Sequence, residues 1–374
     1  MNNKLHYILS PCGTSLLTNN SDPEIRKIIV KYANAGSSDE ISESDLIELK
    51  NRIKAVEEIF VNANYEQAAC MSAEINGIIK FYGGNLANGA NDSHLLLSTD
   101  TWLGEQTANL VKLWLANNLS GSAQIRVHRQ KDLQTSDLES FQIALSDLVK
   151  MMDDEIKDWK KSGYNIIFNL TGGFKAIQGF LQSIANFYAD ETVYVFERSK
   201  ELLRIPKLPV TINAESIVRK HLNAFRKLDN NLSVKKDELL GIPGTMLLNI
   251  GEDTELSAWG KILFRKSKNK IYGEKLLDSP EINIIYSQKF IDSVKGLSGE
   301  RLEMINDKID QLSKFMKDRK YNPKSLDFKA LKGGTNKGST HELDAWADQD
   351  AKRIFCRWNE KNQLILDRLD KGLH

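Results

Sequence analysis

The segment YNIIFNLTGGFK, residues 164–175, constrains the fold more than any other stretch of the chain. Its first half is mostly apolar, which is typical of a buried strand, and Gly172 and Gly173 follow it. Apolar residues then recur at helical spacing from Phe174 to Ala185. The pattern predicts a strand, a glycine turn and a helix. Open α/β sheets bind ligands beside such turns, at the carboxyl ends of their strands.

This predicted turn has the chemistry of an anion-binding site. Gly172 and Gly173 allow backbone N–H groups to approach an anion closely, and the following helix contributes its positive end. Lys175 adds a full positive charge. The alternative is a structural turn with a solvent-exposed lysine, and these residues alone leave both interpretations open.

The rest of residues 1–205 alternates between strand and helix patterns. Short apolar or alternating runs predict further strands at residues 4–10, 94–98, 124–128, 192–196 and 202–205. Amphipathic helices are predicted at residues 102–119 and 138–161. Strands that alternate with helices favour an α/β fold with a mainly parallel sheet.

A helical insertion is predicted between the first and second strands, at about residues 22–83. Its expected helices cover about residues 23–35, 42–62 and 65–82. From Ser38 to Glu66 the segment carries eight acidic and three basic residues. Electrostatic attraction would direct such a surface towards a basic partner. The alternative is plain scaffold or dimer packing.

Composition narrows the function classes. A length of 374 residues is enough for two or three domains, and a net charge of +1 means that any nucleic-acid surface must be local. Cys12, Cys70 and Cys356 are far apart and lack metal-ligand spacing, so we expect reduced thiols in a cytoplasmic protein and no metal site. We expect neither a signal peptide nor a membrane span, because no apolar run is long enough.

Three segments together resemble the CARF domain, the ligand sensor of CRISPR-associated ancillary proteins. They are residues 169–175, residues 5–17 with Gly13-Thr14-Ser15-Leu16-Leu17, and residues 94–104 with Ser98-Thr99-Asp100-Thr101. The resemblance covers about residues 1–205. It implies a Rossmann-like domain that forms a homodimer and binds a cyclic oligoadenylate across the dimer axis, with cyclic tetra-adenylate as the expected activator. The implied ligand-binding residues are Gly13, Thr14, Ser15, Thr99, Asp100, Thr101, Thr171, Gly172, Gly173 and Lys175.

The chain changes character after Pro206 and Pro209. Residues 206–280 are interpreted as a mixed connector without evident chemistry. Residues 281–374 then predict an α+β domain that consists of one strand, two helices, a basic segment and a three-stranded meander. The basic segment, residues 314–337, holds eight basic and two acidic residues.

This order resembles the RelE family of ribosome-dependent messenger-RNA interferases. The matching pieces are residues 328–333, 341–343 and 352–358, within a resemblance that covers about residues 281–374. It implies metal-independent RNA cleavage, in which the neighbouring 2′-hydroxyl attacks the phosphate while basic groups stabilise the phosphate charge and other groups move protons. The implied catalytic residues are Arg353, Lys332, Lys329, His341, Lys371 and His374.

The roles within that set follow from side-chain chemistry. Arg353 and Lys332 would stabilise the phosphate, and His341 and His374 are the candidate proton carriers because histidine titrates near neutral pH. Each lysine could instead be a surface charge or an RNA-backbone contact, and His374 could be a disordered terminus. The alternative for Arg353 is a cross-strand ion pair with Asp344 or Asp348.

The combination resembles CRISPR-associated messenger-RNA interferases in which a CARF sensor is fused to a RelE-type effector. We expect a dimeric ribonuclease that a cyclic oligoadenylate activates and that cleaves messenger RNA on the ribosome. The helical insertion could then bind a basic ribosomal element, and the ribosomal stalk is one candidate. Two alternatives remain open: a ring nuclease that uses Ser15 and Lys175, and a non-catalytic regulator whose C-terminal domain only binds RNA, DNA or a protein.

Overall fold

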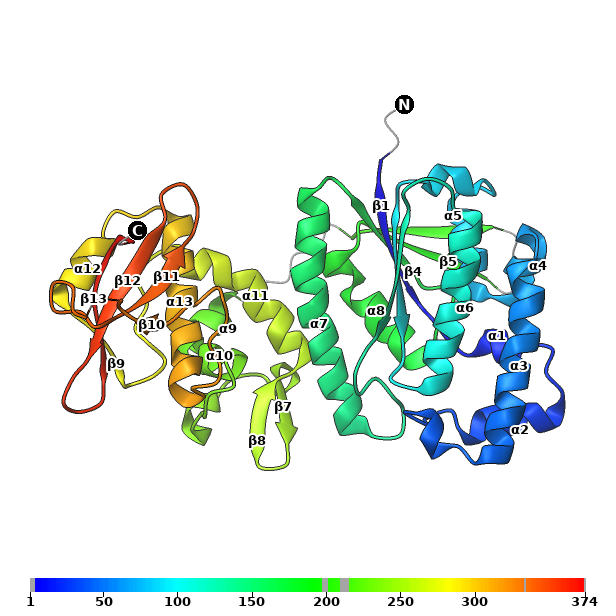
Figure 1. Ribbon diagram of the computed structural model, residues 1–374, viewed down its shortest axis with the longest axis horizontal. Coiled ribbons are helices and arrows are strands. Elements are labelled where there is room, and N and C mark those ends of the chain that lie inside the picture. Colours follow the sequence, from blue (N-terminus) through cyan, green and yellow to red (C-terminus); the bar gives the residue numbers. More distant parts are fainter. Residues whose placement is uncertain (1–3, 197–200, 209–214, 333, 373–374) are drawn as a thin grey trace. The chain divides into compact units, whose positions relative to one another are not determined.

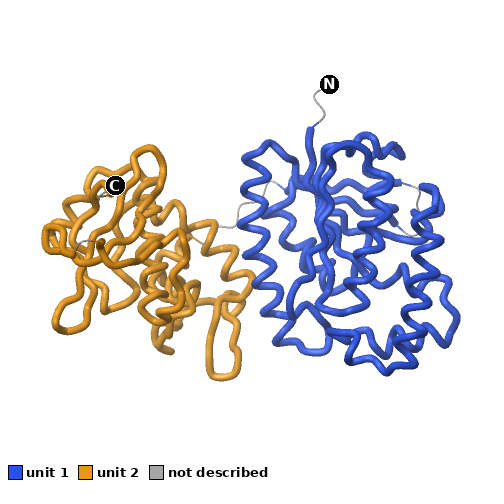
Figure 2. The backbone as a smooth tube through the Cα atoms, in the orientation of Figure 1, with its two compact units in different colours: residues 1–211 blue, residues 212–374 orange. Residues whose placement is uncertain are grey.

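The computed structural model describes residues 4–196, 201–208, 215–332 and 334–372. The chain divides into two compact units, unit 1 over residues 1–211 and unit 2 over residues 212–374 (Figure 2). Among the described residues, no helix combines the length and the apolar character that crossing a membrane requires.

Unit 1 is built around a twisted, mainly parallel sheet (Figure 1). Its strands within the described residues are His6–Pro11 (β1), Ser93–Ser98 (β2), Gln124–Arg129 (β3), Asn165–Asn169 (β4), Glu191–Val195 (β5) and Leu202–Pro206 (β6). They lie in the order β3-β2-β1-β4-β5-β6, and only β6 pairs antiparallel with its neighbour. This is the order of a doubly wound sheet, whose direction of winding changes between β1 and β4. The predicted parallel-rich α/β fold is therefore confirmed for this unit.

Helices cover both faces of this sheet. In Figure 1, α5 and α6 lie on one face and α7 and α8 on the other, while α1 to α4 pack outside α5 and α6. The bounds are Ser15–Thr18 (α1), Pro23–Lys31 (α2), Glu43–Val61 (α3), Tyr65–Met71 (α4), Ala73–Phe81 (α5), Trp102–Asn118 (α6), Leu138–Lys161 (α7) and Lys175–Tyr188 (α8), with 3-10 turns at Ser38–Glu40 and Leu86–Gly89. The chain thus places α1 to α5 between β1 and β2, where the helical insertion was predicted.

The helix expected over residues 65–82 is instead two helices, because Ser72 leaves the helical conformation. Ser72 has φ −128° and ψ 123°, and it ends α4 and caps α5. Its hydroxyl oxygen accepts a hydrogen bond from the N–H of Ile75. A serine that caps a new helix is more stable there than inside a continuous one, because its side chain replaces a missing backbone acceptor.

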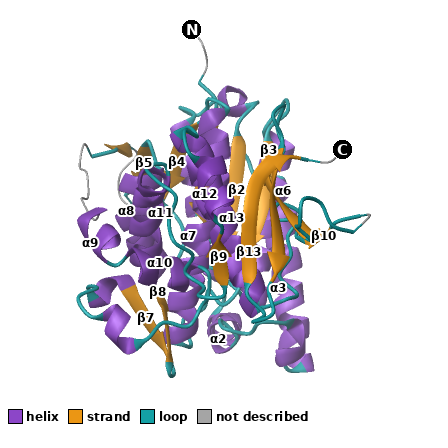
Figure 3. Ribbon diagram, turned by 90° about the vertical axis from the view of Figure 1, so that its left-hand side faces the viewer, coloured by secondary structure: helices purple, strands orange, loops and turns teal. Residues whose placement is uncertain are grey.

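Unit 2 contains the predicted order of one strand, two helices and a three-stranded meander. Its elements from residue 281 onward are Ile284–Tyr286 (β9), Gln288–Val294 (α12), Gly299–Lys317 (α13), Lys329–Ala330 (β10), His341–Trp346 (β11), Lys352–Trp358 (β12) and Leu364–Lys371 (β13). The strand order is β10-β11-β12-β13-β9, and β9 lies parallel beside β13 (Figure 3). The two helices pack on one face of this sheet and form a hydrophobic core with it.

The segment that was expected as a connector packs within unit 2. It forms Glu215–Lys220 (α9), Leu222–Asp229 (α10), Leu247–Ile250 (β7), Asp253–Leu256 (β8) and Ala258–Tyr272 (α11), with 3-10 turns at Lys236–Leu239 and Gly244–Met246. Arg226 on α10 donates to Asp310 on α13, with 2.9 Å between Nε and Oδ1, and both side chains are buried. The Tyr272 hydroxyl donates to the same carboxylate. These contacts make α10 and α11 part of the core of unit 2.

Candidate functional site

The loop after β1 and the turn after β4 lie against each other at the carboxyl edge of the sheet in unit 1. A Cβ atom built on Gly13 would lie 3.4 Å from Cα of Gly173. Gly173 itself has φ +93°, and a Cβ there would come within 2.8 Å of Cβ of Pro11. Glycine is therefore required at position 173 both by backbone conformation and by space. The structure thus brings together the two segments that the sequence predicted as one anion site.

The start of α8 provides a further feature of an anion site. Lys175 is its first residue and is exposed, and the N-cap residue Phe174 has no side chain that can accept a hydrogen bond. The helices α2 to α7 are capped by polar side chains, such as Thr101 for α6 and Asp137 for α7, whereas α1 also lacks a side-chain cap. The first N–H groups of α8 are therefore available to solvent or to an anion, and the helix dipole favours negative charge there.

Asn169, the last residue of β4, connects the turn to its neighbours. Its side-chain amide donates to Oγ of Ser10 at 3.1 Å and to the carbonyl oxygen of Glu74 at 3.0 Å, while Oδ1 accepts from the N–H of Thr171 at 3.4 Å. The sequence motif contained Asn169, but its role was not predicted. The signal was a polar residue at the end of an otherwise apolar strand, where only a hydrogen-bonding partner makes its burial tolerable.

Gln178 holds the turn from the other side and was missed by the sequence analysis. Its amide donates to the carbonyl oxygens of Leu170 at 3.1 Å and of Gly172 at 2.7 Å. The hydroxyl oxygen of Thr171 accepts from the N–H of Val195 at 3.2 Å. The carbonyls of Leu170 and Gly172 are therefore bonded within the chain, as is the N–H of Thr171.

Glu74 is the unexpected residue at this edge. It lies in the first turn of α5, is fully buried, and accepts a hydrogen bond from the N–H of Gly13 at 3.0 Å. The N–H of Gly13, a residue that the CARF resemblance implied as ligand-binding, is thus bonded to a carboxylate of the chain itself. Together with burial, this carboxylate raises the pKa of Cys12, so we expect no thiolate at that position.

The remaining predicted ligand residues differ in how they are held. The hydroxyls of Thr14 and Ser15 are partly exposed, and within the described residues neither has a hydrogen-bond partner. Thr99 and Thr101 share a hydrogen bond of 2.8 Å, and Thr101 caps α6. Asp100 accepts from Nε of Arg129 at 2.8 Å and from the N–H of Asp132 at 2.8 Å. The residues of the β2 loop therefore make hydrogen bonds within the chain, whereas the hydroxyls of Thr14 and Ser15 in the β1 loop are free.

Unit 2 has a cavity of about 430 Å³ at the ends of β11, β12 and β13. Two of the predicted catalytic residues, Arg353 and Lys371, line it together with Asp344, Trp346 and Lys352. Within the described residues Lys371 makes no ion pair, and it is exposed. The cavity therefore combines the side chains of Lys352, Arg353 and Lys371 with the carboxylates of Asp344 and Asp350, and the ring of Trp346 in its wall is buried.

Arg353 is held by carboxylates. Its guanidinium lies 2.7 Å from Oε1 of Glu342, 2.9 Å from Oδ1 of Asp344 and 3.3 Å from Oδ2 of Asp327. The cross-strand ion pair with Asp344 that was considered for Arg353 is present. Asp348 instead pairs with Arg301. The positive charge of Arg353 is thus offset in the arrangement described.

The other predicted catalytic residues do not gather around Arg353. Lys329 is nearby and pairs with Asp327 at 2.5 Å, and this contact holds the pKa of the Asp327 carboxyl below its usual value. Lys332 is exposed and does not line the cavity. His341 stacks on Phe328 on the other face of the sheet, and burial lowers its pKa. His374 lies outside the described residues.

A second cavity in unit 2, of about 660 Å³, is strongly basic. It lies where the end of α13 meets the segments after α10 and before β9, and its cations are Lys227, Lys235, Lys317 and Arg319. Lys227 is paired with Glu238 at 2.6 Å. Arg319 lies over the rings of Phe315 and Trp358. Two basic residues of the predicted segment 314–337, Lys317 and Arg319, therefore lie here, whereas Lys329 shares Asp327 with Arg353.

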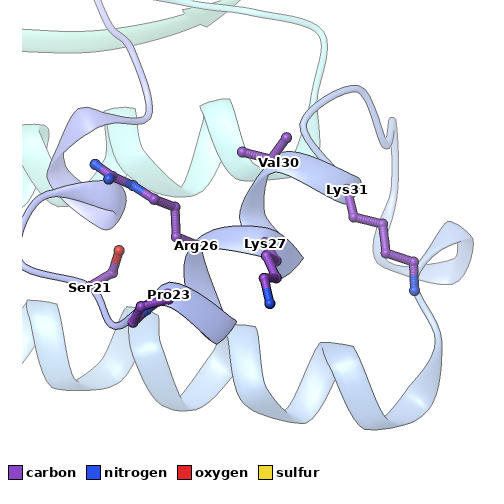
Figure 4. Close-up of a pocket in the computed structure, with 6 residues that line it drawn as sticks. All are labelled: Ser21, Pro23, Arg26, Lys27, Val30 and Lys31. Atoms are coloured by element: carbon purple, nitrogen blue, oxygen red, sulfur yellow. The ribbon is translucent and has the colours of Figure 1, made fainter.

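The helical insertion also has a basic surface. A cavity of about 520 Å³ beside α2 is lined by Ser21, Pro23, Arg26, Lys27, Val30 and Lys31, and Figure 4 shows the three cations projecting from the helix. Lys27 pairs with Glu24 and Lys31 with Asp45, both at 2.8 Å. The acidic stretch of residues 38–66 includes α3, whereas α2 lies before it and carries these cations.

Comparison with known proteins gives a partial match. Residues 69–208 match the family model of a CRISPR-associated protein (Cas_APE2256), and this segment contains Glu74 and the β4 turn. No curated protein matches the chain. Among solved structures, Enterococcus italicus Csm6 bound to cyclic hexa-2′-fluoro-hexa-dAMP aligns at 13% identity with a TM-score of 0.27. The alignment covers 84% of this chain and 64% of that chain, so the chain spans less than two thirds of the length of that protein. The region around the β4 turn is therefore similar to a CRISPR-associated family.

Proposed function

We propose that the chain is a CRISPR-associated ribonuclease that a cyclic oligoadenylate activates. The observation that carries this proposal is the meeting of the β1 loop and the β4 turn beside the uncapped start of α8. Lys175 and the free hydroxyls of Thr14 and Ser15 lie in these same segments. Backbone N–H groups, hydroxyls and one lysine suit phosphates, and a ring of phosphates would occupy the equivalent site in both copies of a homodimer. The family match over residues 69–208 supports the CRISPR context.

In the proposed mechanism, unit 2 cleaves RNA without a metal. The 2′-oxygen attacks the neighbouring phosphorus and gives its proton to a base, while the bond from phosphorus to the 5′-oxygen breaks and an acid protonates that oxygen. Arg353 and Lys371 would stabilise the charge on the phosphate oxygens. The shared cavity of these two residues and the strand order of unit 2 support a RelE-type effector.

The ion pairs of Arg353 fit an enzyme whose activity is low at rest. Asp344 and Glu342 compete with RNA for the same guanidinium. A ligand can activate only by binding more tightly to an arrangement in which Arg353 is released. We propose messenger RNA on the ribosome as the substrate, with the helical insertion as the element that contacts the ribosome, its stalk included.

Calorimetric titration of the full chain with cyclic tetra-adenylate tests the sensor half. Lys175→Ala should weaken binding by about tenfold or more, since it removes one full charge beside the phosphates. Lys112→Ala removes an equally exposed lysine from the middle of α6 and should bind like wild type. Equal binding by all three proteins would remove Lys175 from the site, and no binding by wild type would contradict the proposed ligand.

One observation favours a second function, that of a non-catalytic regulator. Around Arg353 and Lys329 stand Asp327, Glu342 and Asp344, so the carboxylates outnumber the cations. A site with this charge would repel RNA and could serve only to hold the sheet together. RNA that stays intact in the presence of ribosomes and bound activator would favour this function over cleavage.

A further inference from the structure

Glu74 joins the helical insertion directly to the predicted ligand edge. Its carboxylate accepts from the N–H of Gly13 at 3.0 Å through Oε1 and from the hydroxyl of Ser72 at 2.7 Å through Oε2. Each carboxyl oxygen thus has one hydrogen-bond partner. Within the described residues no cation pairs with it, although it is fully buried. An uncompensated buried carboxylate is costly, so its place at this edge calls for a functional explanation.

The fit of α5 against the β4 turn depends on glycines. A Cβ built on Gly172 would come within 2.6 Å of Cγ of Glu74. A Cβ built on Gly77, one turn later in α5, would come within 2.6 Å of Oγ1 of Thr171. Gly172 is therefore needed for contact with Glu74 and not only for the approach of an anion. The turn and the start of α5 form one tightly packed body.

From this geometry we propose that Glu74 is a positioning residue that sets the affinity of unit 1 for cyclic oligoadenylate. Its carboxylate binds the Gly13 amide that a phosphate would otherwise use, and its negative charge opposes the ligand's phosphates. Through the same contact, a change in the position of the β1 loop would shift α5 and thus the helical insertion. The inference rests on the proposed ligand of unit 1 and adds a determinant of its affinity.

The test uses the full chain and titration with cyclic tetra-adenylate. Glu74→Gln keeps the shape and the acceptor for Gly13 but removes the charge, so binding should become at least about tenfold tighter. Glu74→Asp keeps the charge and should bind no more tightly than wild type. Glu66→Gln, an exposed acid on α4, is the matched control and should stay within about twofold of wild type, because exposed charges are screened. A purely structural role predicts the opposite sign, since loss of a turn contact would weaken binding.

A second measurement needs no variant. Hydrogen exchange of the wild-type chain with and without cyclic tetra-adenylate should change in α5, and should stay constant in the outer helix α3. Unchanged or weaker binding by Glu74→Gln, or constant exchange in α5 while wild type binds the ligand, would overturn the role of Glu74. Absence of wild-type binding would instead overturn the proposed ligand, so the two failures are distinguishable.

Discussion

The contact between α5 and the β4 turn makes Gly77→Ala the sharpest stability prediction. A methyl group at position 77 would lie 2.6 Å from Oγ1 of Thr171 and 2.8 Å from Cγ of Asn169. Asn169 is buried and donates two hydrogen bonds, to Ser10 and to the Glu74 carbonyl. Either α5 moves away from the turn, or Asn169 rotates and loses these bonds.

Both responses are costly. Two lost buried hydrogen bonds cost about 2 kcal/mol, and residual overpacking adds about 1 kcal/mol. Replacing glycine by alanine inside a helix returns about 1 kcal/mol. Gly77→Ala should therefore lower the unfolding free energy of unit 1 by about 2 kcal/mol.

Urea-dependent hydrogen exchange of peptides from β1 and β4 measures this free energy for unit 1 alone, which matters because a chain of two units need not unfold in one step. Gly179→Ala is the control, since a methyl group on this residue of α8 meets no atom within 4 Å. It should stabilise unit 1 by about 0.5–1 kcal/mol. Gly77→Ala at or above wild-type stability would refute the tight packing of α5 on the turn.

Three further predictions concern titratable and ion-paired side chains. Burial lowers the pKa of His94 from 6.5 to about 4, so between these two pH values the unfolded chain binds a proton at His94 and the folded chain does not. The neutral His94 therefore contributes its full stability above pH 6.5, and about 3 kcal/mol of unfolding free energy is lost as the pH falls to 4. His94→Gln should reduce this pH dependence of the unfolding free energy in the same exchange assay. Arg226→Met removes the ion-pair partner of the buried Asp310 carboxylate and should cost about 3–5 kcal/mol in unit 2, most of which Asp310→Leu in the same chain should restore. A double variant as unstable as the single one would argue against the lost ion pair as the cause. Asp344→Asn removes one competitor for Arg353 and should raise RNA cleavage without activator severalfold, whereas unchanged basal cleavage would mean that this ion pair does not limit activity.

Local sequence patterns predicted much of the fold. The segment around Asn169 combines a short apolar run, two glycines and then apolar residues at helical spacing. Few structures other than a strand, a turn and a helix fit this pattern. The order of elements after residue 281 followed from the same signals. The break at Ser72 was missed because the apolar residues of α4 and α5 keep nearly the same spacing across it, and only the cap geometry separates the two helices.

The site was harder to predict, because its decisive contacts join distant segments. Glu74 and Gly13 are 61 positions apart, and no local pattern links them. His341 alternates with the buried Leu343, and both side chains lie on the face of the sheet opposite Arg353, an arrangement that depends on the pairing register of β11 and β12. The sequence could not show that Arg353 contacts three carboxylates, because these contacts depend on how β11, β12 and the segment before β10 fold together.

The most direct test of the proposed function is RNA cleavage in a reconstituted translation mixture, with and without cyclic tetra-adenylate. Wild type and Arg219→Ala, which removes an arginine of a surface ion pair on α9, should cleave messenger RNA much faster with the activator than without it. Arg353→Ala should not cleave under either condition. Intact RNA with wild type, despite measured binding of the activator, would contradict the account and leave unit 2 as a regulator.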